Sequence, residues 1–365
     1  MLFHSSIRKE LARSFGATLV VLVTIVMSMV LIRTLGQASK GVVSPQDVML
    51  VMGYTVLGYM PTILTLSLFI AIVGSLSRMY RDSEMVIWFA SGRGLAGFLS
   101  PLLRFAWPVL LVIGAFALLV WPWTNLQTQE LRDRYERRGD LDRVAPGQFQ
   151  ESASGGRVFF IDKDLANSGS SKNVFISTSE RGKETVTSAK SGRIEIIGGD
   201  QFLMLSTGQR MESTTAQGGL KLSEFAEYST RVGPSKIGVP DELPVRAKST
   251  MQLVMEPTRV HQGELAWRIG LALAGLNFVV IALVLSSVNP RVGRTGGLIF
   301  ALFTFVVYYN LINLGQNWVA SGRVGFGGFM LGLHGGGMML GLLWLAKRHK
   351  QWTLRGLLRP RAART

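Results

Sequence analysis

The sequence predicts an α-helical polytopic membrane protein with six transmembrane helices and an all-β domain inserted between the third and the fourth. The chain of 365 residues is 48% hydrophobic, with a mean hydropathy of +0.29. Its apolar residues gather in runs of about twenty, the length that crosses a bilayer as a helix. Residues 124–263 lack such runs and carry short β-like pieces separated by Gly, Ser, Asn and Asp. This segment divides the chain into two similar halves.

The first half, residues 1–123, contains three predicted spans, at about 15–32, 48–77 and 98–120. The second is too long for one straight crossing at about 1.5 Å per residue, so we expect Pro61 to kink or interrupt it. Trp121, Pro122 and Trp123 predict an interfacial anchor and a helix stop at the end of the third span. A charged helical connector is expected from Leu126 to Arg138.

The inserted segment, residues 124–263, is expected to form an antiparallel sandwich or a partly closed barrel. Its β-like pieces lie at 157–162, 173–177, 193–197, 201–205 and 224–231. Prolines at 240, 244 and 257 predict an extended return path to the membrane. The second half, residues 264–347, has predicted spans at about 265–288, 298–314 and 329–346, and a basic tail follows at 348–365.

The distribution of basic residues predicts the orientation of the spans. The formal net charge is +16. Lysines and arginines concentrate on one side, within 8–13, 78–93, 291–294 and 347–364, whereas the opposite short loops hold Lys40 and Arg323. The positive-inside rule therefore predicts cytoplasmic termini and an external β domain, which in a bacterial inner membrane is periplasmic. No nucleic-acid partner is expected, because the basic residues form no stripe with interleaved aromatic residues.

The sequence carries no enzyme signature, so we expect a non-catalytic subunit. With 0 cysteines the chain can form neither a disulfide nor a thiolate metal site. It also lacks the G-x-x-x-x-G-K-[ST] phosphate loop, and its four histidines are scattered without metal-ligand spacing.

The connector between the second and third spans, about residues 82–92, is predicted to contain a short helix. Asp82 or Ser83 can cap it, Glu84 lies in its positive first turn, and Gly92 can end it. Helical spacing places Met85, Trp88 and Phe89 on one face, and Arg81, Glu84 and Ser91 on another. Such a helix could rest on lipid, or it could dock a soluble partner.

Two polar features lie near the outer ends of spans. Arg33 stands at the end of the first span, where it can either extend to the headgroups or meet phosphate groups at the rim of a cavity. Asn310, Asn313 and Asn317 follow a spacing of three and four in the fifth span, so they share one helix face. That face must meet protein or water.

Several short pieces of the sequence resemble one known family. They are Leu31-Ile32-Arg33, Leu35-Gly36, Ser83-Glu84, Ser91-Gly92, Gly147-Gln148-Phe149-Gln150, Glu264-Leu265, Trp267-Arg268, Val288-Asn289-Pro290-Arg291 and Gly293-Arg294. With the three-span, β-domain, three-span layout, they resemble the permeases of the lipopolysaccharide-export ABC transporter, and the F-type subunit in particular.

This resemblance implies a jelly-roll β domain that passes lipopolysaccharide to a similar roll on a membrane-anchored periplasmic adaptor. It implies a homologous G-type permease partner and a homodimer of cytoplasmic ATPase subunits, which would use ATP and Mg²⁺, whereas this chain would bind no cofactor. The helix with Glu84 would be the coupling helix, with Arg81, Asp82, Met85, Trp88 and Phe89 as further contacts. Arg33, Asn310, Asn313 and Asn317 would line the substrate cavity, and Phe160, Ile176 and Phe202 would face the path through the β domain.

Two other functions fit the layout less well. An ion-coupled secondary transporter would need ionisable groups near the bilayer midplane, where the predicted spans show almost none. A membrane-anchored assembly factor would leave the polar residues of the spans unexplained. Co-purification with an ATPase would separate the leading hypothesis from both.

Overall fold

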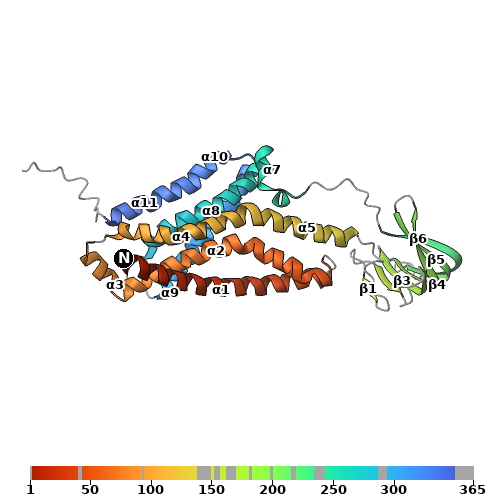
Figure 1. The fold of residues 1–365 in the computed structure, drawn as a ribbon. Coiled ribbons are helices and arrows are strands. Elements are labelled where there is room, and N and C mark those ends of the chain that lie inside the picture. The colour runs from red at the N-terminus through yellow and green to blue at the C-terminus, as the bar shows by residue number, and fades with distance from the viewer. Residues whose placement is uncertain are drawn as a thin grey trace, which may run out of the picture. The chain divides into compact units, whose positions relative to one another are not determined.

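The computed structural model describes residues 2–39, 43–92, 94–137, 149–151, 157–161, 170–180, 183–197, 200–214, 219–233, 243–286 and 294–349. The chain divides into two compact units (Figure 1). One comprises Met1–Leu31, Met52–Thr128 and Leu243–Thr365, and the other Ile32–Val51 and Gln129–Glu242.

The long helices are α1 (Leu2–Ser39), α2 (Val48–Arg81), α4 (Leu99–Ala115), α5 (Trp121–Arg137), α8 (Arg259–Ser286), α9 (Arg294–Ala320) and α11 (Gly336–His349). Shorter elements join them: η1 (Pro45–Asp47), α3 (Glu84–Ala90), η2 (Leu95–Phe98), η4 (Val245–Ala247), α7 (Thr250–Met255), α10 (Phe326–Phe329), and the π-helical turns η3 (Phe116–Val120) and η5 (Met330–Gly335). In the part of the chain that the structure describes, six helices are long and apolar enough to cross a membrane. The predicted fold class is confirmed.

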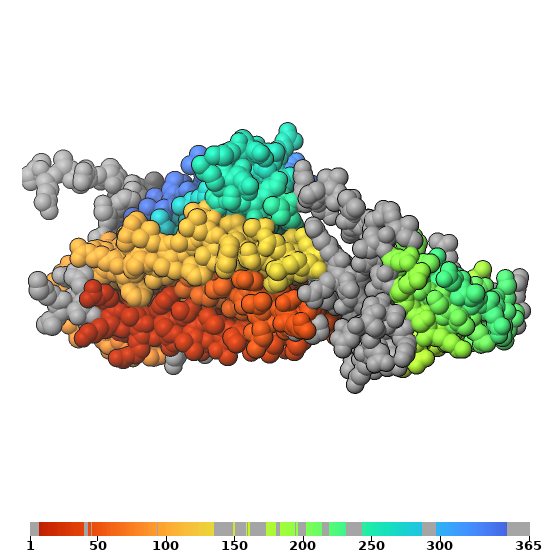
Figure 2. Space-filling model, turned by 45° about the vertical axis from the view of Figure 1, so that its right-hand side comes forward, coloured from red at the N-terminus to blue at the C-terminus, as the bar shows by residue number. Residues whose placement is uncertain are grey.

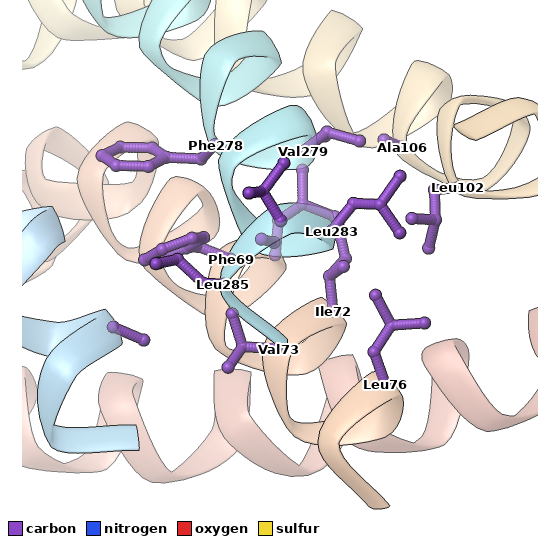
Figure 3. Close-up of a cluster of buried hydrophobic side chains, with 14 of the residues drawn as sticks. Phe69, Ile72, Val73, Leu76, Leu102, Ala106, Phe278, Val279, Leu283 and Leu285 are labelled. Carbon is purple, nitrogen blue, oxygen red and sulfur yellow. The ribbon is translucent and has the colours of Figure 1, made fainter. Parts of the chain in front are cut away.

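The core of the helical unit lies between α2, α4 and α8. Phe69, Ile72 and Leu76 of α2 pack with Leu102 and Ala106 of α4 and with Phe278, Val279 and Leu283 of α8 (Figure 3). All eight side chains are buried. We compared an apolar stretch of 18 residues in each helix. The buried share of this stretch is 72% in α8 and 61% in α2, whereas it is 6% in α1. Helices α2 and α8 therefore form the interior of the unit, and α1 exposes most of its apolar surface.

Two prolines that we expected to kink, interrupt or end helices lie inside them. Helix α2 continues through Pro61, which is buried, so the proline does not interrupt the helix. The predicted stop at Pro122 is wrong, because α4, η3 and α5 follow one another without a break. Pro122 cannot donate a hydrogen bond to the carbonyl of Leu118, four residues earlier. The hydroxyl of Thr250 donates to that carbonyl at 2.5 Å and so satisfies it.

The second unit contains one antiparallel sheet in which each strand pairs with its neighbours in sequence. The strands are β1 (Gln150–Glu151), β2 (Arg157–Ile161), β3 (Ser170–Glu180), β4 (Lys183–Ile197), β5 (Asp200–Thr214) and β6 (Gly219–Gly233). The five predicted pieces correspond to β2 to β6, except that residue 162 of the first piece lies outside the described part of the chain, and β4, β5 and β6 each reach 15 residues. The all-β insertion is confirmed.

The return path is not simply extended, because it contains η4 and α7. Ser249 and Gln252 form a capping box at the start of α7, in which each side chain bonds the other's backbone N–H. Leu253 is buried and anchors the helix. These interactions give helical structure to a segment whose prolines predicted none.

Candidate functional site

An ionic cluster around Arg78 joins α1, α2 and α3. The Arg78 guanidinium donates to both carboxylate oxygens of Glu10 at 2.5 Å, through Nε and Nη2. Its Nη1 donates to Glu84 at 3.0 Å and to Asp82 at 3.2 Å. A planar guanidinium suits such two-pronged binding of a carboxylate. Arg78 therefore connects the first turn of α3 with α1, where its partner Glu10 lies 68 residues earlier in the sequence.

The start and end of α3 follow the prediction only in part. Ser83 is the N-cap residue, in a left-handed conformation with φ of 59°, but its side chain makes no capping hydrogen bond. The Asp82 carboxylate accepts instead from Arg78 and, at 3.3 Å, from Arg81. Gly92, with φ of +82°, ends the helix as predicted, and its N–H donates to Phe89.

The exposed surface of α3 differs from the face that we predicted. Met85 is 1% exposed and belongs to the core of the helical unit, so it cannot contact a partner as expected. Trp88 packs partly against the same core. The exposed apolar side chains are Val86, Ile87 and Phe89. The prediction placed Met85 with Phe89 by spacing alone, which cannot show which side of a short helix the chain itself covers.

A second ionic cluster, which we call the polar junction, is buried where the chain re-enters the helical unit. Glu264 and Arg268 lie one turn apart on α8 and form an ion pair at 3.0 Å, with side chains 3% and 0% exposed. The carboxylate of Glu264 also accepts from Trp121 at 3.0 Å and from Gln316 at 2.9 Å. The polar junction therefore links α5, α8 and α9.

The other nitrogens of Arg268 hold the return path. Nη1 donates to the hydroxyl of Thr250 at 2.8 Å. Nη2 is shared among the backbone carbonyls of Val245, Arg246 and Lys248, at 3.5, 3.2 and 3.1 Å. Because Thr250 also donates to Leu118, one chain of hydrogen bonds runs from α8 through the return path to η3.

One of the predicted cavity residues faces the interior of the unit, and the other three are exposed. Asn313 accepts from the indole of Trp267 at 3.1 Å and donates to the Tyr309 carbonyl at 3.0 Å, so it faces the interior of the unit. Asn310 and Asn317, on the same side of α9, are exposed. Arg33 is exposed on α1. Their contact with substrate stays a prediction.

The register of the sheet separates residues that we expected to share one face. Val174, Ile176, Ala189, Leu203 and Leu205 form a buried cluster, with Phe225 and Tyr228 packed against it. Ile176 belongs to this core face, and its place on the substrate path stays a prediction. Phe202 precedes Leu203 in β5 and therefore points to the opposite face, where it pairs with Glu195 and Arg231.

Phe160 also lies on the opposite face from Ile176. It pairs with Phe175, the residue before Ile176, and Phe149 packs on both rings at centroid distances of 4.7 and 6.1 Å. The inward placement of Phe160 and Phe202 was thus wrong. Both belong to apolar runs, and such runs do not reveal which alternate residues face the core.

Comparison with known proteins decides the family. The sequence model of the lipopolysaccharide export system permease LptF/LptG family matches residues 6–348. The chain belongs to this permease family. The lipopolysaccharide export system permease protein LptF of Escherichia coli K12 is 25% identical over 309 residues, which are 82% of this chain and 82% of that protein. The LptF protein of Shigella flexneri matches to the same extent.

The LptF/LptG match includes α3, both ionic clusters and the sheet. Glu264 and Arg268, quoted above for the resemblance, are the buried pair of the polar junction. Residues 288–293, which carried much of the resemblance, lie outside the described part of the chain. Sequence reasoning missed Glu10 and Thr250, because their partners are distant in sequence. It also missed the role of Arg78, although a spacing of four residues, from Arg78 to Asp82 and from Glu264 to Arg268, is a local signal of an ion pair.

Proposed function

We propose that this chain is a permease subunit that extracts lipopolysaccharide from the periplasmic leaflet of a Gram-negative inner membrane. It passes the lipid through its β domain toward a membrane-anchored periplasmic adaptor. The observation that carries this function is the family match, which extends from residue 6 to 348 through both apolar halves and the inserted sheet. The names of the LptF relatives, which are lipopolysaccharide export system permease proteins, support the choice of substrate.

A separate cytoplasmic ATPase homodimer drives the transport with ATP and Mg²⁺, and a homologous G-type permease completes the membrane body. The ATPase docks on α3, where Val86, Ile87 and Phe89 expose apolar surface beside the carboxylate of Glu84. An apolar patch next to one charge suits a groove of matching chemistry. The ends of the chain are cytoplasmic and the sheet is periplasmic, as the basic residues predict.

Inside the membrane body, Arg33 at the outer end of its span offers a guanidinium to the phosphate groups of lipopolysaccharide. The exposed amides of Asn310 and Asn317 add hydrogen-bonding groups on α9. In the β domain the core face with Ile176, Leu203 and Leu205 is apolar enough to receive acyl chains. Of the three predicted path residues, we therefore keep Ile176 and no longer assign Phe160 and Phe202 to the path.

The test is association with the ATPase and its dependence on α3. An affinity-tagged chain should retain the ATPase during purification, and Ile87→Asp should abolish this retention because it places a charge in the docking surface. The control is Ala96→Asp, which introduces the same carboxylate at an exposed position outside α3. Retention by Ile87→Asp equal to that of the control would contradict docking at α3, and no retention by the unaltered chain would contradict the ABC assignment.

The orientation has its own experiment. The chain contains 0 cysteines, so one cysteine placed at Ser170 or at Thr353 is the sole target for an impermeant thiol reagent. In cells with a permeabilised outer membrane, the reagent should label position 170 and spare position 353. Labelling of position 353 alone would reverse the topology.

A further inference from the structure

Helix α7 exposes two chemically different sides. Met251, Val254 and Met255 are 63%, 58% and 67% exposed, although all three are large and apolar. At about 100° per residue they share one sector of the helix, while Gln252 and Glu256 share the next. Leu253 is buried against the helical unit. One exposed side is therefore apolar and the other polar, which is the pattern of a helix at a boundary between lipid and water.

The contacts of α7 place it at the level where the apolar part of the bundle ends. Thr250, its first residue, bonds the carbonyl of Leu118. Leu118 is near the end of an apolar run that is followed at once by Trp121 and Trp123. Trp121 packs on Trp267, with ring centroids 4.7 Å apart, and the side chain of Trp123 is 47% exposed. Tryptophans concentrate at the border between the hydrocarbon and the headgroups.

The charges around α7 also fit a lipid surface. Between residues 243 and 260 the sequence has Arg246, Lys248 and Arg259 but one acidic residue, Glu256. Arg246 and Arg259 are exposed. Cations beside an apolar helix face attract anionic headgroups, which strengthens interfacial binding. Figure 1 shows α7 beside α8, and in Figure 2 the turquoise segment that includes it forms a ridge on the surface of the helical unit.

We propose that α7 is an interfacial helix whose Met251, Val254 and Met255 enter the lipid of the outer leaflet. Its apolar side lies about 5–10 Å into the boundary between headgroups and acyl chains. Gln252 and Glu256 face water. Through Thr250 and Arg268, the helix joins the lipid surface to the polar junction. The proposal rests on the topology proposed above and does not depend on transport activity.

Site-directed spin labelling of the full chain in lipid nanodiscs tests this position. A cysteine at Val254 or Met255 carries the only label, because the natural chain has no cysteine. Labels at both positions should be relaxed strongly by oxygen, which partitions into lipid, and weakly by a water-soluble nickel complex. A label at Glu256, the matched control on the polar side, should show the reverse order.

Three outcomes would each be decisive. Strong relaxation by nickel at Val254 and Met255, as at Glu256, would overturn the proposal by placing both sides in water. Protection of both positions from both reagents would overturn it by showing that protein covers the face. The expected reversal between positions 255 and 256 would support it. An impermeant thiol reagent on Glu256→Cys in cells reports the topology separately, so failure of the topology is distinguishable from failure of lipid contact.

Discussion

Replacing Arg268 with leucine should destabilise the helical unit by about 3–5 kcal/mol, the usual cost of removing one partner of a buried ion pair. The structure shows why the full cost is expected here. The Glu264 carboxylate would keep the neutral donors of Trp121 and Gln316 but lose the only cation bonded to it among the described residues. The hydroxyl of Thr250 and the backbone carbonyls of Val245, Arg246 and Lys248 would also lose the guanidinium that donates to them.

The thermal midpoint of the purified protein measures this change. A loss of 1 kcal/mol lowers the midpoint by about 2–4 °C in a unit of this size, about 230 residues, so Arg268→Leu should lower it by about 6–20 °C. Arg323→Leu removes an exposed arginine from the same unit and is the control. Its effect should stay within about 0.5 kcal/mol, which is typical of surface substitutions.

A double-mutant cycle separates the ion pair from lost packing. Glu264→Gln combined with Arg268→Leu leaves no uncompensated charge at the polar junction. The double variant should therefore be more stable than the sum of the single effects predicts, by a coupling energy of about 0.5–3 kcal/mol. A midpoint unchanged by Arg268→Leu, or strictly additive effects in the cycle, would refute the reasoning.

Three further predictions concern the proposed transport. Glu84→Arg should weaken ATPase retention more than Glu84→Ala, because a second guanidinium would face Arg78 and the basic residue expected in the ATPase groove; equal retention would refute the pairing. Arg33→Glu should reduce lipopolysaccharide transport more than Arg33→Lys, because a carboxylate repels phosphate, and wild-type transport by both would leave Arg33 as a headgroup anchor. A photocrosslinker at Ile176 should capture lipopolysaccharide in an ATP-dependent manner more efficiently than one at Phe202, and the reverse order would move the path to the opposite face of the sheet.

The sequence was sufficient for the spans and the inserted sheet, because both depend on patterns that extend over many residues. Twenty apolar residues in a row are hard to place anywhere except across a bilayer. The continuity at Pro122 could not be predicted, since it depends on a hydroxyl from Thr250, distant in the sequence. Helix α7 was missed because its six residues are too few for a clear periodic pattern, and its capping box was overlooked between Pro244 and Pro257.

Among the site residues, those with a local sequence signal were located correctly, and those whose placement depends on tertiary packing were not. Glu84 and Gly92 were located correctly, because a first-turn carboxylate and a terminal glycine are local signals. The burial of Met85 was not predictable, since it depends on which side of α3 meets the core. In β5, apolar residues on both faces hid the side to which Phe202 points. Non-glycine residues with positive φ, such as Thr207 at 53°, also interrupt the simple alternation of that strand.

The helical unit combines a fixed core with one helix that the core hardly covers. Along α2, Gly58 lies against Trp121 beside the polar junction, and Arg78 lies about 30 Å further along at the rise of an α-helix. The packed core of Figure 3 fills α2 between these points, and close packing resists internal rearrangement. Helix α1 is different, because 6% of its apolar 18-residue stretch is buried. It meets this core near its first turns, through Ile7, Leu11 and the Glu10–Arg78 ion pair. Because Arg78 binds both Glu10 and Glu84, a displacement of α3 would act on the same guanidinium that holds α1, so Arg78 couples the position of the first helix to that of α3.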